Sequence, residues 1–120
     1  MPGTYHGITE GTNGLPIISK TVVFNGKVYL CGITASKGGS IEEQTREVLS
    51  RIDHLLLGAG SDKGKVLTAQ VWLTSMADFA AMNAIWNRWV DPEHPPVRAC
   101  VQAALYKPEL LVEIMVTATT

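Results

Sequence analysis

An arginine, a thiol and a carboxylate occur close together near the C-terminus, in two stretches with alternating apolar residues. In 97–105, Arg98 and Cys100 fall on the face opposite the apolar positions, and in 111–118 Glu113 does the same. The short bridge 106–109 contains a proline, as many turns do. This pattern predicts a hairpin that places Arg98, Cys100 and Glu113 on the same side of a sheet.

Each of these three side chains has a structural and a chemical interpretation. A buried arginine needs a partner, which is either Glu113 in an ion pair or the carboxylate of a small ligand gripped by the guanidinium fork. Glu113 is then either that partner or a general base acting on a water molecule. Cys100 is typical of a small buried apolar residue, since a nucleophilic thiol needs a neighbouring base and no histidine is close in sequence.

The rest of the chain predicts the elements that position these groups. Strands are expected over 17–24 and 27–34, joined at Asn25-Gly26, a pair typical of a type I′ turn. Gly32 interrupts the second of them, which indicates either a bulge or a close approach of a ligand or another backbone. A short edge strand over 4–8 is also expected.

Two helices and a further strand follow. Ser40 with Glu43 has the form of a capping box, and apolar residues at helical spacing run on to Leu56. A strand is expected over 66–74. Ser75 with Asp78 predicts the start of a second helix, which carries Asn83 near its beginning, pointing either to local backbone or into a pocket. The prediction is an α+β domain in which both helices cover one face of a sheet of about five or six strands.

The second face of that sheet has no helix to cover it. We expect it to carry Trp72, Met115, Ala104 and Cys100 among polar groups. Large apolar side chains on an open sheet face predict self-association, with the Arg98 and Glu113 side of the hairpin at or near a subunit boundary.

Composition excludes several classes of function. The 120 residues suffice for one domain, 1–120, with 46% hydrophobic and 18% charged residues and a formal net charge of −1. There is no basic excess for nucleic acid, no apolar run of about 20 residues for a membrane span, and no secretory signal. Without a signal, the thiols Cys31 and Cys100 favour a reducing cytoplasm.

No metal or phosphate site is expected either. His6, His54 and His94 do not share a metal-ligand spacing, and the two cysteines form no C-x-x-C pair. The glycines form neither of the phosphate-binding patterns.

The residues also resemble a known family. The runs 96–101 and 111–114, the helix text 79–86, Asn25-Gly26 and Gly32 resemble the RidA/YjgF family of reactive intermediate deaminases, also labelled endoribonuclease L-PSP. The similarity spans about residues 16–118 and is strongest to the YoaB-like branch.

This resemblance implies a chorismate-mutase-like α+β fold with a mixed six-stranded sheet and two helices packed on one face. It also implies a homotrimer with pockets between adjacent chains. It implies hydrolysis of 2-imino acids and their enamine tautomers to 2-oxo acids and ammonia without a metal or organic cofactor. Arg98 would then hold the substrate carboxylate and Glu113 would position or activate water. The remaining pocket residues by this resemblance are Cys100, Gly32, Asn83, Cys31 and Ile18.

Two of these positions depart from the deaminase pattern. Ile18 stands where the deaminases are expected to have a tyrosine, and Cys31 where they have a serine. Carboxylate binding does not depend on either, whereas hydrolysis or its substrate does. The alternatives are therefore a non-catalytic trimer that binds small 2-oxo acids, and an endoribonuclease, against which the net charge argues.

Overall fold

A computed structural model of the chain describes residues 3–120. The elements form one domain with two α-helices, two single 3₁₀ turns and seven strands. In chain order they are β1 (Thr4–His6), β2 (Thr21–Phe24), β3 (Lys27–Leu30), β4 (Ile33–Thr34), α1 (Ile41–Gly58), a 3₁₀ turn (Lys63–Lys65), β5 (Val66–Leu73), a 3₁₀ turn (Met76–Asp78), α2 (Phe79–Trp89), β6 (Val97–Gln102) and β7 (Val112–Thr119).

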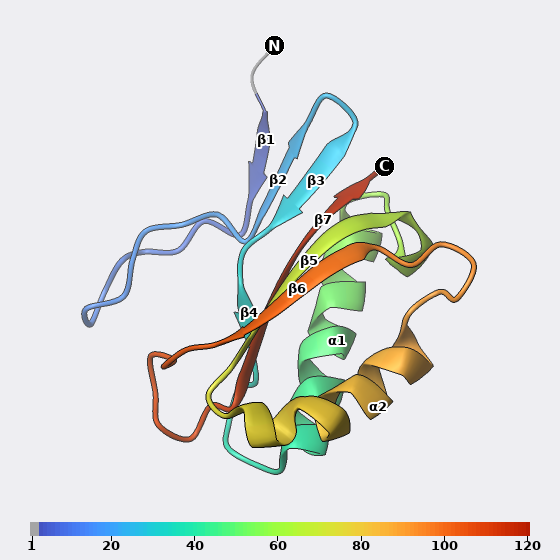
Figure 1. Ribbon diagram of the computed structural model, residues 1–120. Coiled ribbons are helices and arrows are strands. Elements are labelled where there is room, and N and C mark those ends of the chain that lie inside the picture. The colour runs from blue at the N-terminus through green and yellow to red at the C-terminus, as the bar shows by residue number, and fades with distance from the viewer. Residues whose placement is uncertain (1–2) are drawn as a thin grey trace.

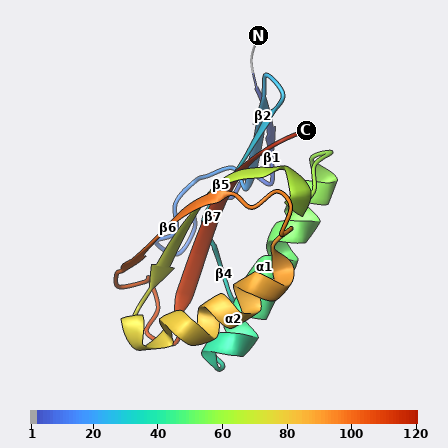
Figure 2. The same cartoon turned by 45° about the vertical axis from the view of Figure 1, so that its right-hand side comes forward.

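The strands form a single mixed sheet in the order β1-β2-β3-β7-β5-β6, with β4 pairing with β7 off this path. Only β5 and β6 run parallel. Both helices lie against the same face of the sheet (Figures 1 and 2). The predicted α+β class is confirmed, with one short strand more than the six expected.

Local signals explain the first turn and the first helix. Asn25 and Gly26 have φ angles of 52° and 75°, the positive values that a type I′ turn needs, and Phe24 pairs with Lys27 across it. At the start of α1 the capping box is complete. The Glu43 amide donates to Ser40 Oγ at 3.1 Å, and the Ser40 amide donates to Glu43 Oε1 at 2.9 Å.

The core lies between the helices and the covered face of the sheet. Leu49, Ile52 and Leu56 of α1 are buried against sheet residues such as Val71 and Ile114. Burying each such side chain contributes roughly 1.5–3 kcal/mol. This packing fixes the positions of α1 and α2 relative to the strands that carry the chemistry. None of the helices within residues 3–120 is long and apolar enough to cross a membrane.

The predicted hairpin over 97–118 is wrong. β6 and β7 run in opposite directions, but β5 lies between them and pairs with both. The chain between them covers residues 103–111, which is long enough to cross the end of β5, and the Ala103 amide donates to the Leu73 carbonyl there. Both stretches do contain a strand, although β6 ends at Gln102 and its apolar positions Val97 and Val101 are exposed, whereas the predicted pairing of the two stretches is wrong.

Several boundaries also differ from the predictions. The strand expected from residue 17 starts at Thr21, because 9–18 form a loop in which Thr9 Oγ1 bonds with Pro16 and Ile18. The strand expected over 27–34 breaks at 31–32 into β3 and β4. Ser75 caps the 3₁₀ turn before α2, so Asn83 lies in the middle of the helix and not at its start.

Candidate functional site

The first group of predicted site residues is held by β6 and α2. We call Arg98, Asn83 and Cys100 the arginine half-site. Arg98 pairs in register with Ala69 of β5, which pairs with Val116 of β7, and both are buried under the helices. Residues paired across strands share a face. The side chain of Arg98 therefore points to the helix side, at the edge of the sheet that β6 forms.

The guanidinium of Arg98 is held in place by α2. Nη2 donates to Asn83 Oδ1 at 2.7 Å, and Nη1 lies 3.7 Å from Met82 Sδ. The guanidinium carbon lies 5.0 Å from the ring centroid of Trp86 and 6.0 Å from that of Phe79. Among residues 3–120 the sole ion pair is His94 with Asp91, so this half-buried cation has no carboxylate partner in its own chain.

The second group is built around the break between β3 and β4. We call Glu113, Gly32, Cys31 and Ile18 the glutamate half-site. Glu113 pairs with Thr34 of β4, and its carboxylate lies directly over Gly32. A Cβ added to Gly32 would stand only 2.0 Å from Glu113 Oε2. Gly32 thus leaves room for the Glu113 side chain, which neither predicted alternative, a bulge or the close approach of a ligand or another backbone, had named.

Glu113 is a half-buried carboxyl with no hydrogen bond or ion pair among the described residues. Burial raises the pKa of this carboxyl above its ordinary value of 4.5, because the charged form loses hydration without gaining a partner. A carboxyl whose pKa is shifted toward neutrality is better matched to proton transfer near neutral pH.

The two thiols are not activated. Burial raises the pKa of Cys31 above 9.0, against the opposing effects of Lys20 and Arg51. Burial likewise raises the pKa of Cys100, against the effect of Arg98. Both remain protonated at neutral pH, so neither is set up as a nucleophile.

The two half-sites lie on opposite faces of the sheet. Glu113 pairs with Trp72 of β5, whereas Arg98 pairs with Ala69, three residues earlier. Cys100 shares the covered face with Arg98, since it pairs with Val71. The prediction that Arg98, Cys100 and Glu113 share one side is therefore wrong, as is the placement of Cys100 on the uncovered face. It failed because the parity of two strands cannot be compared until their register is known.

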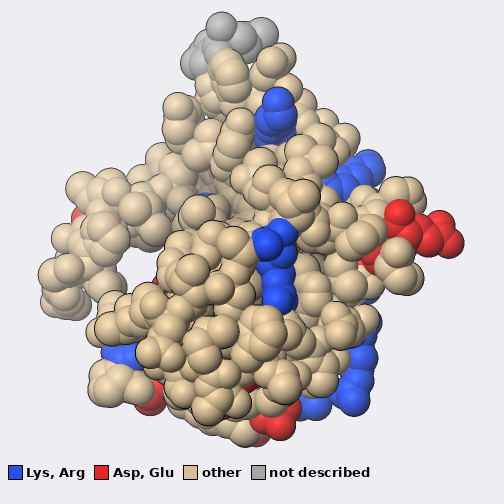
Figure 3. Space-filling view, in the orientation of Figure 1, with Lys and Arg blue, Asp and Glu red and all other residues tan. Residues whose placement is uncertain are grey.

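The uncovered face has the apolar character expected of it. Trp72 and Met115 lie there, together with Val97, Val101 and Tyr29, whose side chains are 71%, 47% and 43% exposed. In the orientation of Figure 3, most of the visible surface is uncharged and the acidic groups lie near its margins.

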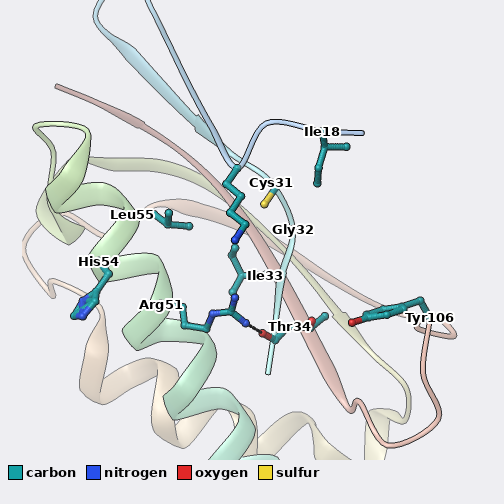
Figure 4. A pocket seen from close by; sticks show the side chains of 10 residues that line it. Ile18, Cys31, Gly32, Ile33, Thr34, Arg51, His54, Leu55 and Tyr106 are labelled. Carbon is teal, nitrogen blue, oxygen red and sulfur yellow. Dashed lines mark hydrogen bonds between the residues drawn. The ribbon is translucent and has the colours of Figure 1, made fainter. Parts of the chain in front are cut away.

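A pocket of about 410 Å³ adjoins the glutamate half-site (Figure 4). Ile18, Cys31 and Gly32 line it. That they bind a substrate there stays a prediction. Sequence reasoning missed Lys20, Arg51 and Tyr106 in its wall, and missed the aromatic rings that flank Arg98. No signal in the sequence links these residues before the fold is known.

No group of three or more His, Cys, Asp or Glu side chains within residues 3–120 is arranged to hold a metal ion.

Comparison with known proteins places this architecture. A family model described as endoribonuclease L-PSP matches residues 17–120. The chain belongs to the RidA/YjgF family. The RutC family protein YoaB of Escherichia coli K12 is 40% identical over 100 residues, covering 83% of this chain and 88% of that protein.

Other members extend the comparison. The structure of NMB1025, a YjgF family protein from Neisseria meningitidis, superposes with a TM-score of 0.92 at 41% identity and covers 100% of this chain and 96% of that one. A protein named 3-aminoacrylate deaminase RutC, from Acinetobacter baylyi, is 40% identical over 76 residues, which is 63% of this RidA/YjgF protein and 60% of that relative.

Proposed function

We propose that this protein assembles as a homotrimer and hydrolyses small 2-imino acids and their enamine tautomers to 2-oxo acids and ammonia, without a cofactor. Arg98 of one protomer and Glu113 of its neighbour share each site. The name of the Acinetobacter relative supports this chemistry, since 3-aminoacrylate is an enamine of a carboxylic acid.

One observation carries the proposal. Arg98 is a half-buried cation without an anion, and Glu113 is a half-buried anion without a cation, among residues 3–120. Because they lie on opposite faces of the same sheet, they cannot meet within one chain. A second copy whose β6 edge, which carries Arg98, meets the uncovered face beside Glu113 would bring the two half-sites together, and a bound carboxylate would neutralise the charge of Arg98.

The arginine half-site would bind and orient the substrate. A guanidinium offers paired N–H donors that match a carboxylate. The hydrogen bond from Arg98 to Asn83 and the two aromatic rings beside the guanidinium fix the direction of these donors. Fixing one end of a small substrate places the imine carbon at a defined distance from the opposite wall. Because an imine is intrinsically reactive toward water, this positioning supplies most of the rate acceleration that its hydrolysis needs.

The glutamate half-site would supply the proton transfers. The reaction starts from the imine protonated on nitrogen, its iminium form. Glu113 takes a proton from water as the water oxygen bonds to the iminium carbon, and it then returns that proton to the nitrogen. The C–N bond breaks as Glu113 accepts the proton of the new hydroxyl, giving the 2-oxo acid and ammonia with one water consumed. Glu113 passes this proton to the ammonia, which leaves as ammonium. An enamine first takes up a proton from solvent at its β-carbon, which gives the same iminium.

The test compares the wild-type protein with Arg98→Met and Glu113→Gln on imines made in the assay from alanine by an amino-acid oxidase. We expect the rate of 2-oxo acid formation above the uncatalysed rate to disappear in both variants. The two differ in binding: Glu113→Gln retains affinity for a 2-oxo acid in calorimetry and Arg98→Met does not. An Arg98→Met protein with the wild-type rate overturns the proposal.

A non-catalytic binding trimer is the second candidate, because Ile18 and Cys31 place no hydroxyl in the pocket wall where the deaminases are expected to have one. Saturable binding of a 2-oxo acid by the wild type without any rate would establish it. Since both cysteines are free thiols, a reducing compartment such as the cytoplasm is the proposed location.

A further inference from the structure

The pocket beside the glutamate half-site carries more positive charge than a small monocarboxylic imine requires. It lies along β4, on the side where α1 approaches (Figure 4). Two cationic side chains, Lys20 and Arg51, form part of its wall, and no acidic side chain lines it. The other side chains of the wall include His54, the apolar Ile18 and Leu55, and the hydroxyl-bearing Thr34 and Tyr106.

Arg51 is oriented but not neutralised. Its Nη1 donates to the Thr34 carbonyl at 2.8 Å, which directs the guanidinium to the pocket side of β4 and leaves its other N–H groups available. Glu47, one turn earlier on α1, accepts instead from the Ser36 amide at 2.6 Å and forms no ion pair with Arg51.

Lys20 reaches the same place from the other wall. The Cys31 amide donates to the Lys20 carbonyl at 3.0 Å, which fixes this residue beside the β3–β4 break. Its side chain forms neither an ion pair nor a hydrogen bond within residues 3–120. Lys20 and Arg51 line the same pocket as Gly32, and Gly32 lies against the Glu113 carboxylate, so the two cations and this carboxylate adjoin one pocket.

We propose that Lys20 and Arg51 bind a second carboxylate, so that the preferred substrates are 2-imino dicarboxylic acids of four or five carbons. This inference rests on the function proposed above. The first carboxylate binds Arg98 of the neighbouring protomer, the imine carbon lies at Glu113, and the distal carboxylate enters the pocket. A substrate with a methyl or ethyl side chain leaves both cations without a partner.

The products are then a 2-oxo dicarboxylic acid and ammonia, by the same balanced addition of one water. The reaction that supplies such a substrate is the oxidation of an acidic amino acid at its α-carbon, which removes two electrons and leaves the C=N bond.

The experiment measures kcat/KM on two imines generated in the assay by amino-acid oxidases, one from aspartate and one from alanine. For the wild type we expect the dicarboxylic imine to be favoured by at least about tenfold, the value of one charge-assisted hydrogen bond. Lys20→Met and Arg51→Met should each remove most of this preference, because kcat/KM falls much more on the dicarboxylic imine than on the alanine-derived imine.

Arg46→Met is the matched control. It removes the same charge from the same helix, but Arg46 lines a separate groove between α1 and α2. The preference should not change. If loss of the Thr34 bond unfolds Arg51→Met, Lys20→Met still decides the matter, because the side chain of Lys20 makes no hydrogen bond whose loss would destabilise the fold.

The outcomes separate the two proposals. A wild-type protein that hydrolyses neither imine refutes the proposed function itself. A wild type that hydrolyses both equally well, or whose preference survives both Lys20→Met and Arg51→Met, refutes the second-carboxylate pocket and leaves the deaminase proposal standing.

Discussion

Replacing Gly32 by alanine tests the geometry of the glutamate half-site with a single methyl group. The new Cβ would stand 2.0 Å from Glu113 Oε2 and 2.9 Å from Glu113 Cδ, whereas ordinary contacts begin at 3.4 Å. The carboxylate must therefore move by more than 1 Å. Such a displacement of a catalytic group costs about 100-fold in rate, so we expect kcat/KM to fall by roughly that factor.

The same substitution should hardly affect folding. The clashing atoms are at the end of a flexible side chain with no hydrogen bond to lose, and Gly32 does not have the positive φ that would strain an alanine. We expect the free energy of unfolding to change by less than about 1 kcal/mol. Steady-state kinetics on an alanine-derived imine and urea denaturation of the same preparation measure the two effects.

Gly58→Ala is the control for adding a methyl group. Gly58 ends α1, has no atom within 4 Å of the added Cβ and has no positive φ, so neither rate nor stability should fall. Full activity in Gly32→Ala would refute the assignment of Glu113 as the proton-transfer group at this position. A loss of several kcal/mol of stability would refute the argument that the glycine serves the site and not the fold.

Three further predictions follow from the same contacts. Glu113→Gln should become more stable relative to wild type as pH rises above 4.5. A carboxyl with a raised pKa in the folded state stabilises the fold at acid pH and loses that contribution as it ionises. Urea denaturation of both proteins across pH measures the difference, and a difference that does not change with pH contradicts the raised pKa. Asn83→Ala removes the 2.7 Å bond to Arg98, a charged hydrogen bond of about 1.5–3 kcal/mol, so KM should rise about tenfold or more with a smaller change in kcat. Val101→Glu puts a carboxylate on the uncovered face and should give monomers in sedimentation velocity. The control Leu57→Glu, at an exposed position of α1, should not. If Val101→Glu still forms a trimer, the interface between protomers lies elsewhere.

The features predicted correctly from sequence are those decided by neighbouring residues. The Asn25-Gly26 turn needs positive φ at two adjacent positions, and the Ser40 capping box needs two side chains three residues apart. Each of these features is formed by residues no more than three positions apart, so the local sequence is enough to predict it. The alternation within β6 and β7 is of the same kind.

The pairing of strands is decided by groups far apart in the chain, and there the prediction failed. The strands β6 and β7 are consecutive in the sequence, yet β5, which begins some 30 residues before β6, lies between them in the sheet. The alternation of apolar residues defines the two faces of a strand. It does not indicate which other strand pairs with either of its two edges. Lys20 and Arg51 were missed for the same reason, since a loop and a helix meet at their pocket only after the sheet has formed.

The error in pairing changes what the site residues imply. In a hairpin, Arg98 and Glu113 would have faced one another, and an internal ion pair would have accounted for both without any ligand. With β5 inserted, Arg98 points toward α2 and Glu113 points away from the helices, so that internal pair is impossible. Two half-buried charged groups without an oppositely charged partner cost free energy in an isolated chain. The proposed second protomer and bound carboxylate would remove that cost together, which is why the opposite placement of these residues favours the proposed shared site more strongly than their predicted proximity did.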